Sequence, residues 1–405
     1  MLKMNPIASS KNLKSIYDLF FKKKTVFAIW IVISLSFVID SWISHRMNNY
    51  LIFENTFRNL INHQSLYGWY PSFHDDANHY GPIFTIIIAP FALFPNWLGL
   101  LFWNLFNCLI LFKAINTLPI NDRNKCIIYY IAVPCLIESM LNQQFNPIAG
   151  ALIILNYTML NKREGFFSSL FMVLGIFVKL YGIVGMAFFL FVKNKPRFLL
   201  FTLFWSVFFF LLPMLFASPK FVAQSYLDWF VSLTEKNTAN ISGNGRDISI
   251  IGFCRDIGIP ISNMVGIATG ALLFLIPYLN PSLYKDEKLQ LLILASALLF
   301  PIIFSTGAED CTFIISATGV GIWYLHDPGR SFKNLLLPAL LILACNFPVL
   351  LFPEFAKRHM VLQSMLSFPY FLIWLRILHC TIIGKIGIMQ KDGKISPVCG
   401  TLKTR

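Results

Sequence analysis

Apolar runs about as long as a bilayer is thick recur along this chain, and they constrain its fold more than any other feature. They begin near Thr25 and continue into the C-terminal region of the 405 residues; 56% of the residues are hydrophobic and only 13% are charged. A hydrocarbon core about 30 Å thick takes roughly 20 apolar residues to cross as a helix. In lipid every backbone polar group must be satisfied within the protein, so these runs are helices. The sequence therefore predicts an all-α, polytopic integral membrane protein.

Basic residues stand mainly in short segments between the apolar runs, and they give the chain a net charge of +14. Examples are KKK at 22–24, KRE at 162–164 and KNKPR at 193–197. An excess of Lys and Arg is typical of cytoplasmic loops. The charge therefore indicates membrane orientation, and we expect a lipid bilayer and no nucleic acid as partner.

When the apolar runs are placed so that the basic segments between them face the cytoplasm, the sequence predicts 11 to 13 crossings with both chain ends in the cytoplasm. We expect a cytoplasmic amphipathic N-terminus over 1–24, a single transmembrane domain over 25–384 and a basic cytoplasmic tail over 385–405. Within the domain, 45–82 and 218–261 are long enough to form structured outer loops. The expected crossings are 25–44, 97–113, 126–141, 145–160, 197–217, 262–279, 288–305, 311–326, 334–352 and 362–384, with a short helix at 83–95.

The segment 165–192 is different because it lies between two basic, hence cytoplasmic, loops and is too short for two full crossings. Two shortened helices that meet near Lys179 fit its length at about 1.5 Å per residue. Lysine inside a membrane is costly unless it faces a cavity or a charged partner, so Lys179 is a functional candidate. The alternative is a lysine whose ammonium group reaches the membrane interface.

The first outer loop gathers most of the polar residues that need an explanation. It contains four of the seven histidines and the adjacent Asp75 and Asp76, and its aromatic content argues against disorder. The stretch 51–61 has apolar residues at helical spacing and includes Glu54. A carboxylate held at such an interface can act as a general base. The aspartates, and likewise Glu309 with its neighbour Asp310, could instead cap the helices that follow them.

Metal and nucleotide motifs are absent from the sequence. The histidines lack metal-ligand spacing, and the chain has no Walker loop, GxGxxG or GxSxG motif. We therefore expect no cofactor; a divalent metal is not indicated, although Glu309 and Asp310 on the same side leave it possible.

Several segments resemble glycosyltransferase family 87, a group of GT-C type, through their order and spacing. They read NNYLIFENTFRNLINHQSLYGWYP, YGPIFTIIIAPFALFP, WNLFN, NQQFNPIAGALIIL and GIFVKLYGIVG. The similarity covers most of the chain and is strongest from about 49 to 195.

The resemblance implies a GT-C fold and a polyprenyl-phosphate sugar as donor, with mannose the first candidate among hexoses. It also implies a glycan or glycolipid acceptor that is modified on the extracytoplasmic face, here of a bacterial inner membrane. In such enzymes an acidic residue of the first outer loop deprotonates the acceptor, and polyprenyl phosphate leaves. The mannosyltransferase branch has an aspartate at the opening of the motif that reads NNYLIF here, where Asn49 stands in this chain.

We assign candidate roles to residues on this basis. Asp76 is the first choice for the base, followed by Asp75 and Glu54. Lys179 and Tyr181 match the family's lysine–tyrosine element and are assigned to the donor phosphate, with Arg246 and Arg255 as further candidates. The candidates for contact with sugar or acceptor are Asn49, Tyr80, Gln143, Gln144, Asn146 and Glu309.

Two other functions remain open on sequence grounds. A transporter or flippase of a lipid-linked sugar would also use broken helices and an intramembrane lysine. A catalytically inactive assembly subunit would be consistent with asparagine at position 49.

Overall fold

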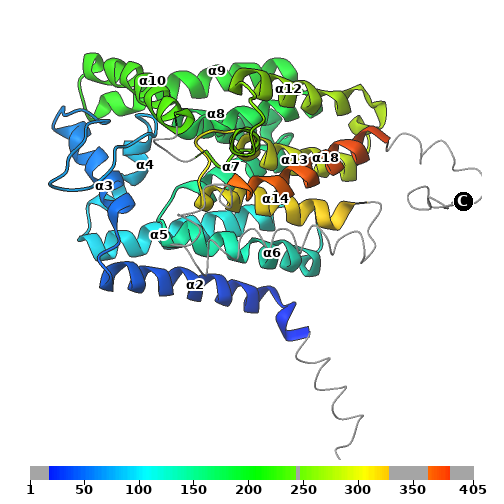
Figure 1. Cartoon of the computed structure of the whole chain (residues 1–405), viewed down its shortest axis with the longest axis horizontal. Helices are drawn as coiled ribbons and strands as arrows, with labels where there is room; N and C mark the ends of the chain where they lie inside the picture. Colours follow the sequence, from blue (N-terminus) through cyan, green and yellow to red (C-terminus); the bar gives the residue numbers. More distant parts are fainter. Residues whose placement is uncertain (1–17, 243–246, 328–363, 384–405) are drawn as a thin grey trace, which may run out of the picture.

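The computed structural model describes residues 18–242, 247–327 and 364–383, and within these ranges the chain is helical and has no strand. Figure 1 shows long helices that lie roughly side by side, with α3, α4 and the start of α10 gathered at one end. The expectation of an all-α protein is therefore confirmed. The expected crossing at 334–352, the tail at 385–405 and most of the N-terminal segment 1–24 lie outside the described residues.

Four helices are long and apolar enough to cross a membrane: α2 (Lys23–Ile43), α5 (Asn96–Asn116), α6 (Asp122–Leu141) and α9 (Lys195–Leu211) with its 3-10 extension η3 (Leu212–Leu215). The other apolar helices are shorter: α7 (Asn146–Thr158), α8 (Phe166–Lys179), α12 (Asn263–Leu275), α13 (Glu287–Ile303), α14 (Phe313–His326) and α18 (Ser367–Ile383). With 13 residues, α7 extends about 20 Å, less than a bilayer core. The predicted count of 11 to 13 crossings therefore stays a prediction.

The central helices and the peripheral helices differ in what they bury. On α13 and α14 nearly every residue up to Ile303 and Trp323 is buried, and these two helices pack against each other. On α9 the outward side chains are large and apolar: Leu199, Leu200, Leu203, Phe204, Val207, Phe208 and Leu211 are all exposed. An apolar face of this size is what a helix in contact with lipid carries.

The segment 165–192 is a broken helix, as the sequence predicts. The α8 helix ends at Lys179, Leu180 has a positive φ of 36°, and the 3-10 helix η2 (Tyr181–Phe191) returns along α8. Two glycines allow this approach, because a Cβ on Gly182 would lie 2.5 Å from the carbonyl carbon of Gly175. Lys179 therefore lies at the tip of a helix pair rather than in mid-helix.

Residues 45–82, which the sequence predicts to be the first outer loop and for which we keep that name, are structured, as expected. The loop begins with the amphipathic helix α3 (Asn48–Ile61) and leads into the short helix α4 (Phe84–Ala92), which packs on α3. The backbone N–H of Gly81 donates to the carbonyl of Val178 at 3.0 Å, so the end of this loop is attached to the tip of α8.

The segment 218–261, predicted to be the second outer loop, contains a long helix, α10 (Pro219–Ile241), followed by α11 (Ile250–Asp256). Ser218 caps α10 by accepting from the N–H of Phe221, and Pro219 occupies its first turn. The remaining short elements are 3-10 helices: η1 (Lys162–Gly165), η4 (Ile276–Leu279), η5 (Pro281–Tyr284) and η6 (Asp310–Thr312).

Hydrogen bonds tie α10 to the first outer loop and to the loop after α13. Near the start of α10, the N–H of Ser218 donates to His63 Nε2 at 3.1 Å. Farther along, Trp229 Nε1 donates to the carbonyl of His79 at 2.9 Å. Near its end, Asn240 Nδ2 donates to the carbonyl of Thr306 at 2.8 Å. The two outer segments and the loop after α13 therefore meet at one end of the molecule.

Candidate active site

A cavity of about 330 Å³ lies where these segments meet. It is bounded by α3, the loop before α4, the tip of α8, the polar face of α10 and the loop after α13. The lining residues are Asn49, Ile52, Phe53, Asp76, Ala77, Asn78, His79, Tyr80, Gln144, Lys179, Leu180, Tyr181, Trp229, Leu233, Lys236, Asn237, Asn240, Ser305, Thr306, Gly307 and Glu309.

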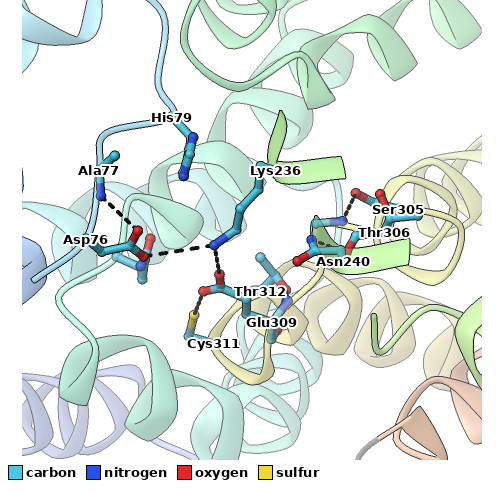
Figure 2. Close-up of polar contacts among 12 residues, drawn as sticks. Asp76, Ala77, His79, Lys236, Asn240, Ser305, Thr306, Glu309, Cys311 and Thr312 are labelled. Atoms are coloured by element: carbon cyan, nitrogen blue, oxygen red, sulfur yellow. Dashed lines mark hydrogen bonds and ion pairs between the residues drawn. The ribbon is translucent and has the colours of Figure 1, made fainter. Parts of the chain in front are cut away.

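Two carboxylates face one ammonium group across this cavity. Lys236 on α10 places its Nζ 3.9 Å from Asp76 Oδ2 and 4.0 Å from Glu309 Oε1. Figure 2 shows its side chain extending between the two acids, one from the first outer loop and one from the segment before η6. Asp76 Oδ1 also accepts the N–H of Ala77 at 2.8 Å, which fixes the direction of this carboxylate.

A second ammonium group, that of Lys179, lies at the tip of α8. Its Nζ donates to Asn146 Oδ1 at 2.7 Å and stands 5.5 Å from the ring centroid of Tyr80 and 5.0 Å from that of Tyr181. Distances of this size permit cation–π attraction. Asn146 follows the turn before α7, so α7 and the first outer loop together hold the lysine in place.

Tyr80 joins the loop to the turn between α6 and α7. Its hydroxyl donates to Gln144 Oε1 at 2.7 Å, and burial raises the pKa of Tyr80 well above its ordinary value. The phenol therefore remains protonated at neutral pH and keeps its role as a donor.

His79 is held at the wall of the cavity by α10. Its Nδ1 lies 2.7 Å from Ser232 Oγ. Burial is the main cause that lowers the pKa of His79, and Lys236 lowers it further against the opposing effect of Asp76 and Glu309. The imidazole is therefore neutral at physiological pH and adds no charge to the cavity.

Seven of the predicted site residues line the cavity together, although they come from separate parts of the sequence. They are Asn49, Asp76, Tyr80, Gln144, Lys179, Tyr181 and Glu309.

Two alternative bases do not reach the cavity. Glu54 lies on the face of α3 turned away from it, is buried, and is paired with Arg58 at 2.5 Å. Asp75 is exposed, and its backbone N–H donates to Asn48 Oδ1 at 2.8 Å. Adjacent residues of an extended loop point in different directions, so only Asp76 of the pair faces the cavity.

Three other predicted contacts have structural roles instead. Arg255 on α11 is outside the cavity lining, where it pairs with Asp247 and donates to Asn263 Oδ1 at 2.7 Å. Gln143 is buried, with Nε2 donating to Ser41 Oγ and to two backbone carbonyls. Asn146 acts through Lys179 rather than on the cavity. Arg246 lies outside the described residues.

Asn49 lines the cavity but uses its amide to hold the fold together. Its Nδ2 donates to the carbonyl of Asn142 at 2.9 Å. An aspartate at this position could not donate this bond. The asparagine therefore suits the position structurally, and the carboxylate of the first outer loop that lines the cavity is that of Asp76.

The polar face of α10 is the part of the site that sequence reasoning missed. Trp229, Leu233, Lys236, Asn237 and Asn240 all line the cavity, and their spacing is that of one helical face. This periodicity was readable in the sequence, but only the packing of α10 on the first outer loop gives it meaning. Some polar atoms of this face have hydrogen-bond partners within the protein: Asn237 Oδ1 accepts from Thr306 Oγ1 at 2.6 Å.

The arrangement combines groups for two chemical tasks. An exposed carboxylate can take a proton from a hydroxyl, and nearby ammonium groups can bind an anion such as phosphate. Among residues 18–242, 247–327 and 364–383, no three His, Cys, Asp or Glu side chains come together as a set of metal ligands.

The family model for glycosyltransferase family 87 matches residues 78–306 of this chain. The match contains Lys179 and Lys236, and it begins just after Asp76 and ends just before Glu309. No curated protein and no solved structure matches the chain. Because the family model covers more than half of the 405 residues, the chain belongs to glycosyltransferase family 87.

Proposed function

We propose that this glycosyltransferase moves a hexose, with mannose as the first candidate, from a polyprenyl-phosphate sugar to a glycan or glycolipid. Membership of the family carries the transferase activity. The observation that supports the lipid-phosphate donor is the cavity, because it places two ammonium groups and two carboxylates on facing walls. The apolar surface of the neighbouring helices suits a substrate whose prenyl chain lies in the bilayer.

Asp76 is the base in this proposal. The acceptor hydroxyl gives its proton to the Asp76 carboxylate while its oxygen forms a bond to the anomeric carbon of the donor sugar. The bond from that carbon to the phosphate oxygen breaks, and its electron pair stays on polyprenyl phosphate. Attack from the face opposite the phosphate inverts the anomeric configuration.

Lys179 and Tyr181 hold the donor phosphate. The ammonium group is a point charge at a fixed position, and a phosphate leaving group needs cationic stabilisation more than it needs a proton. Asn146 and the two tyrosine rings fix this position, as described above. Neutral polar groups on the same walls, those of Asn49, Tyr80 and Gln144, suit hydrogen bonds to sugar hydroxyls, and Glu309 suits the acceptor.

The active site faces the extracytoplasmic side of a bacterial inner membrane in this proposal. Its support is the position of the basic loops. Lys193 and Asn161 meet through a 3.1 Å hydrogen bond, and Arg197 pairs with Glu164, so the segments at 162–164 and 193–197 lie together. They stand at the start of α8 and the end of η2, whereas the cavity lies at the opposite tip of this pair. The positive-inside rule puts the basic end in the cytoplasm.

A transfer assay on purified protein with polyprenyl-phosphate sugars tests the proposal. We expect Asp76→Asn to lower transfer by about 10²- to 10⁴-fold, the usual contribution of a general base. Asp75→Asn is the matched control, because its side chain is adjacent in sequence and does not line the cavity. Equal transfer by wild type and Asp76→Asn would remove Asp76 as the base.

A transporter or flippase of a lipid-linked sugar is the second candidate function. The broken helix with Lys179 at its tip favours it, since transporters place substrate groups at such breaks. Sugar-lipid movement across proteoliposomes without cleavage of the sugar–phosphate bond would support this candidate. Absence of both transfer and movement would indicate an inactive assembly subunit.

A further inference from the structure

We propose that Lys236 is a second ligand of the donor phosphate, and that it exchanges the carboxylates of Asp76 and Glu309 for this phosphate when the donor binds. The inference rests on the proposed function, because it presupposes a donor that carries phosphate. It adds a residue of α10 to the substrate-binding groups and gives a reason for donor binding to precede acceptor binding.

The geometry of Lys236 is that of a cation shared between two partners. Its distances of 3.9 Å and 4.0 Å to the two carboxylates are nearly equal. Both exceed the 2.7–3.2 Å range of N–H···O hydrogen bonds. The ammonium group is therefore attracted to both acids through charge alone, without a directed bond to either, and a closer anion can displace them.

Lys179 and Lys236 differ in how firmly they are held. Lys179 donates to Asn146 at 2.7 Å and stands beside two aromatic rings. Lys236 makes no hydrogen bond within the described residues, and its side chain is 31% exposed. Lys179 is thus a fixed cation, whereas Lys236 extends from α10 on a flexible stem that can change partner.

The charge balance of the cavity makes such an exchange necessary. Among the described lining residues the charged groups are two carboxylates and two ammonium groups, and they cancel. A bound phosphodiester adds one negative charge, and during cleavage a second negative charge moves from Asp76, which becomes protonated, to polyprenyl phosphate. Anionic phosphate next to an unscreened carboxylate is unfavourable. Movement of Lys236 toward the phosphate places a cation between the phosphate and the two acids.

The exchange also prepares the acceptor step. While Lys236 lies between them, Asp76 and Glu309 share its positive charge. Once Lys236 contacts the phosphate, Asp76 is available to accept a hydrogen bond from the acceptor hydroxyl and then its proton. Donor binding would therefore precede productive acceptor binding.

The test measures binding and does not depend on turnover. The probe is farnesyl phosphate, a short polyprenyl phosphate without sugar, titrated calorimetrically into the full chain in detergent. We expect Lys236→Met to raise the Kd at least about tenfold, the effect of losing one close charge interaction. Lys236→Arg should retain most of the affinity. Lys220→Met is the matched control, because Lys220 lies exposed on the first turn of the same helix and outside the cavity.

A double-mutant cycle tests the exchange itself. Glu309→Gln removes one competitor for Lys236 and should tighten binding of farnesyl phosphate. In the Lys236→Met background Glu309→Gln should increase the affinity for farnesyl phosphate less, because part of its effect in the wild type comes from freeing Lys236 to contact the phosphate. Equal effects in the two backgrounds would overturn the exchange, and this arm holds even if a residue of the cavity affects folding yield.

The outcomes separate this inference from the proposed function. Equal affinity of wild type and Lys236→Met for farnesyl phosphate overturns the role of Lys236 and leaves the donor class intact. Failure of the wild type to bind any polyprenyl phosphate overturns the donor class and the inference together.

Discussion

Lys179 stands at the end of α8 with an amide oxygen and two aromatic rings around its ammonium group, and among the described residues no carboxylate lies within ion-pairing distance. The Asn146 oxygen and the two rings therefore fix the position of this ammonium group at the cavity wall. Asn146 therefore acts as a positioning residue, although the sequence suggested a direct contact with sugar.

Lys179→Met should weaken donor binding because it removes the fixed cation from the phosphate site. We expect the KM for the lipid donor to rise about tenfold or more, because one charge interaction with the phosphate is lost. Steady-state kinetics with varied donor provide the measurement, and Lys193→Met, an exposed lysine outside the cavity, is the control. An unchanged KM would assign the phosphate to other residues.

The pKa of His79 reports on the charge of Lys236. A neighbouring cation disfavours protonated imidazole, so its removal in Lys236→Met should raise the pKa of His79 from its lowered value. NMR titration of ¹³C-labelled histidines provides the measurement, with His79→Gln to assign the signal and Lys220→Met as control. A lower or unchanged pKa of His79 in Lys236→Met would contradict the electrostatic effect of Lys236 on His79.

The same lowered pKa has a consequence for stability. Because folded His79 resists protonation, the unfolded chain binds this proton first as pH falls below about 6.5, the ordinary value for histidine. The contribution of His79 is therefore present above pH 6.5 and is lost as pH falls toward its pKa in the folded protein. His79→Gln should show a smaller loss of thermal stability over this interval.

At the level of elements, the contact between the first outer loop and the tip of α8 depends on one glycine. A Cβ on Gly81 would lie 1.9 Å from the carbonyl oxygen of Phe177, closer than any real contact. The loop would have to move away from α8, and Tyr80 and Lys179 would separate. The glycine is needed here for close approach of two backbones.

Gly81→Ala should therefore destabilise the protein by about 1–3 kcal/mol, the usual cost of overpacking. A fall in Tm measured by thermal unfolding in detergent would show it. Gly150→Ala on α7 is the control, because its nearest neighbour would lie at an ordinary 3.5 Å. If both variants unfold at the wild-type temperature, the close approach does not matter to stability.

The α10 helix follows from its sequence, but its place in the cavity wall does not. Its length and its start at Ser218 and Pro219 follow ordinary helix rules. Its polar stripe with Lys236 would be read as a solvated face of an outer segment. Hydrogen bonds from Trp229 and Asn240 to two distant loops turn that stripe into a cavity wall.

For the whole molecule, the basic loops and the cavity lie at opposite ends of the α8–η2 pair. We expect Ser72→Cys, on the exposed surface of the first outer loop, to react with a membrane-impermeant maleimide in intact cells. Lys193→Cys should react only after permeabilisation. The described native cysteines are buried except Cys254, which is half-buried. Background labelling of these cysteines by the maleimide should therefore be low. The opposite labelling pattern would reverse the proposed orientation.

Part of the candidate site was predictable because it follows from local chemistry. Lys179 at a helix break and Asp76 before an apolar helix each stand out against their own neighbours. Glu54 and Arg255 stood out equally, yet the structure pairs them with Arg58 and Asp247, outside the cavity lining. A single charged residue in a sequence does not reveal which partner will neutralise it.

The sequence by itself determined the helical class, the long apolar helices, the amphipathic α3 and the break between α8 and η2. Those features depend on apolar length, helical spacing and the separation of basic segments, all of which are local. Only the tertiary structure decided that Lys236 faces Asp76 and Glu309. These residues belong to three segments far apart in the chain, and their meeting depends on how α10, the first outer loop and the end of α13 pack together.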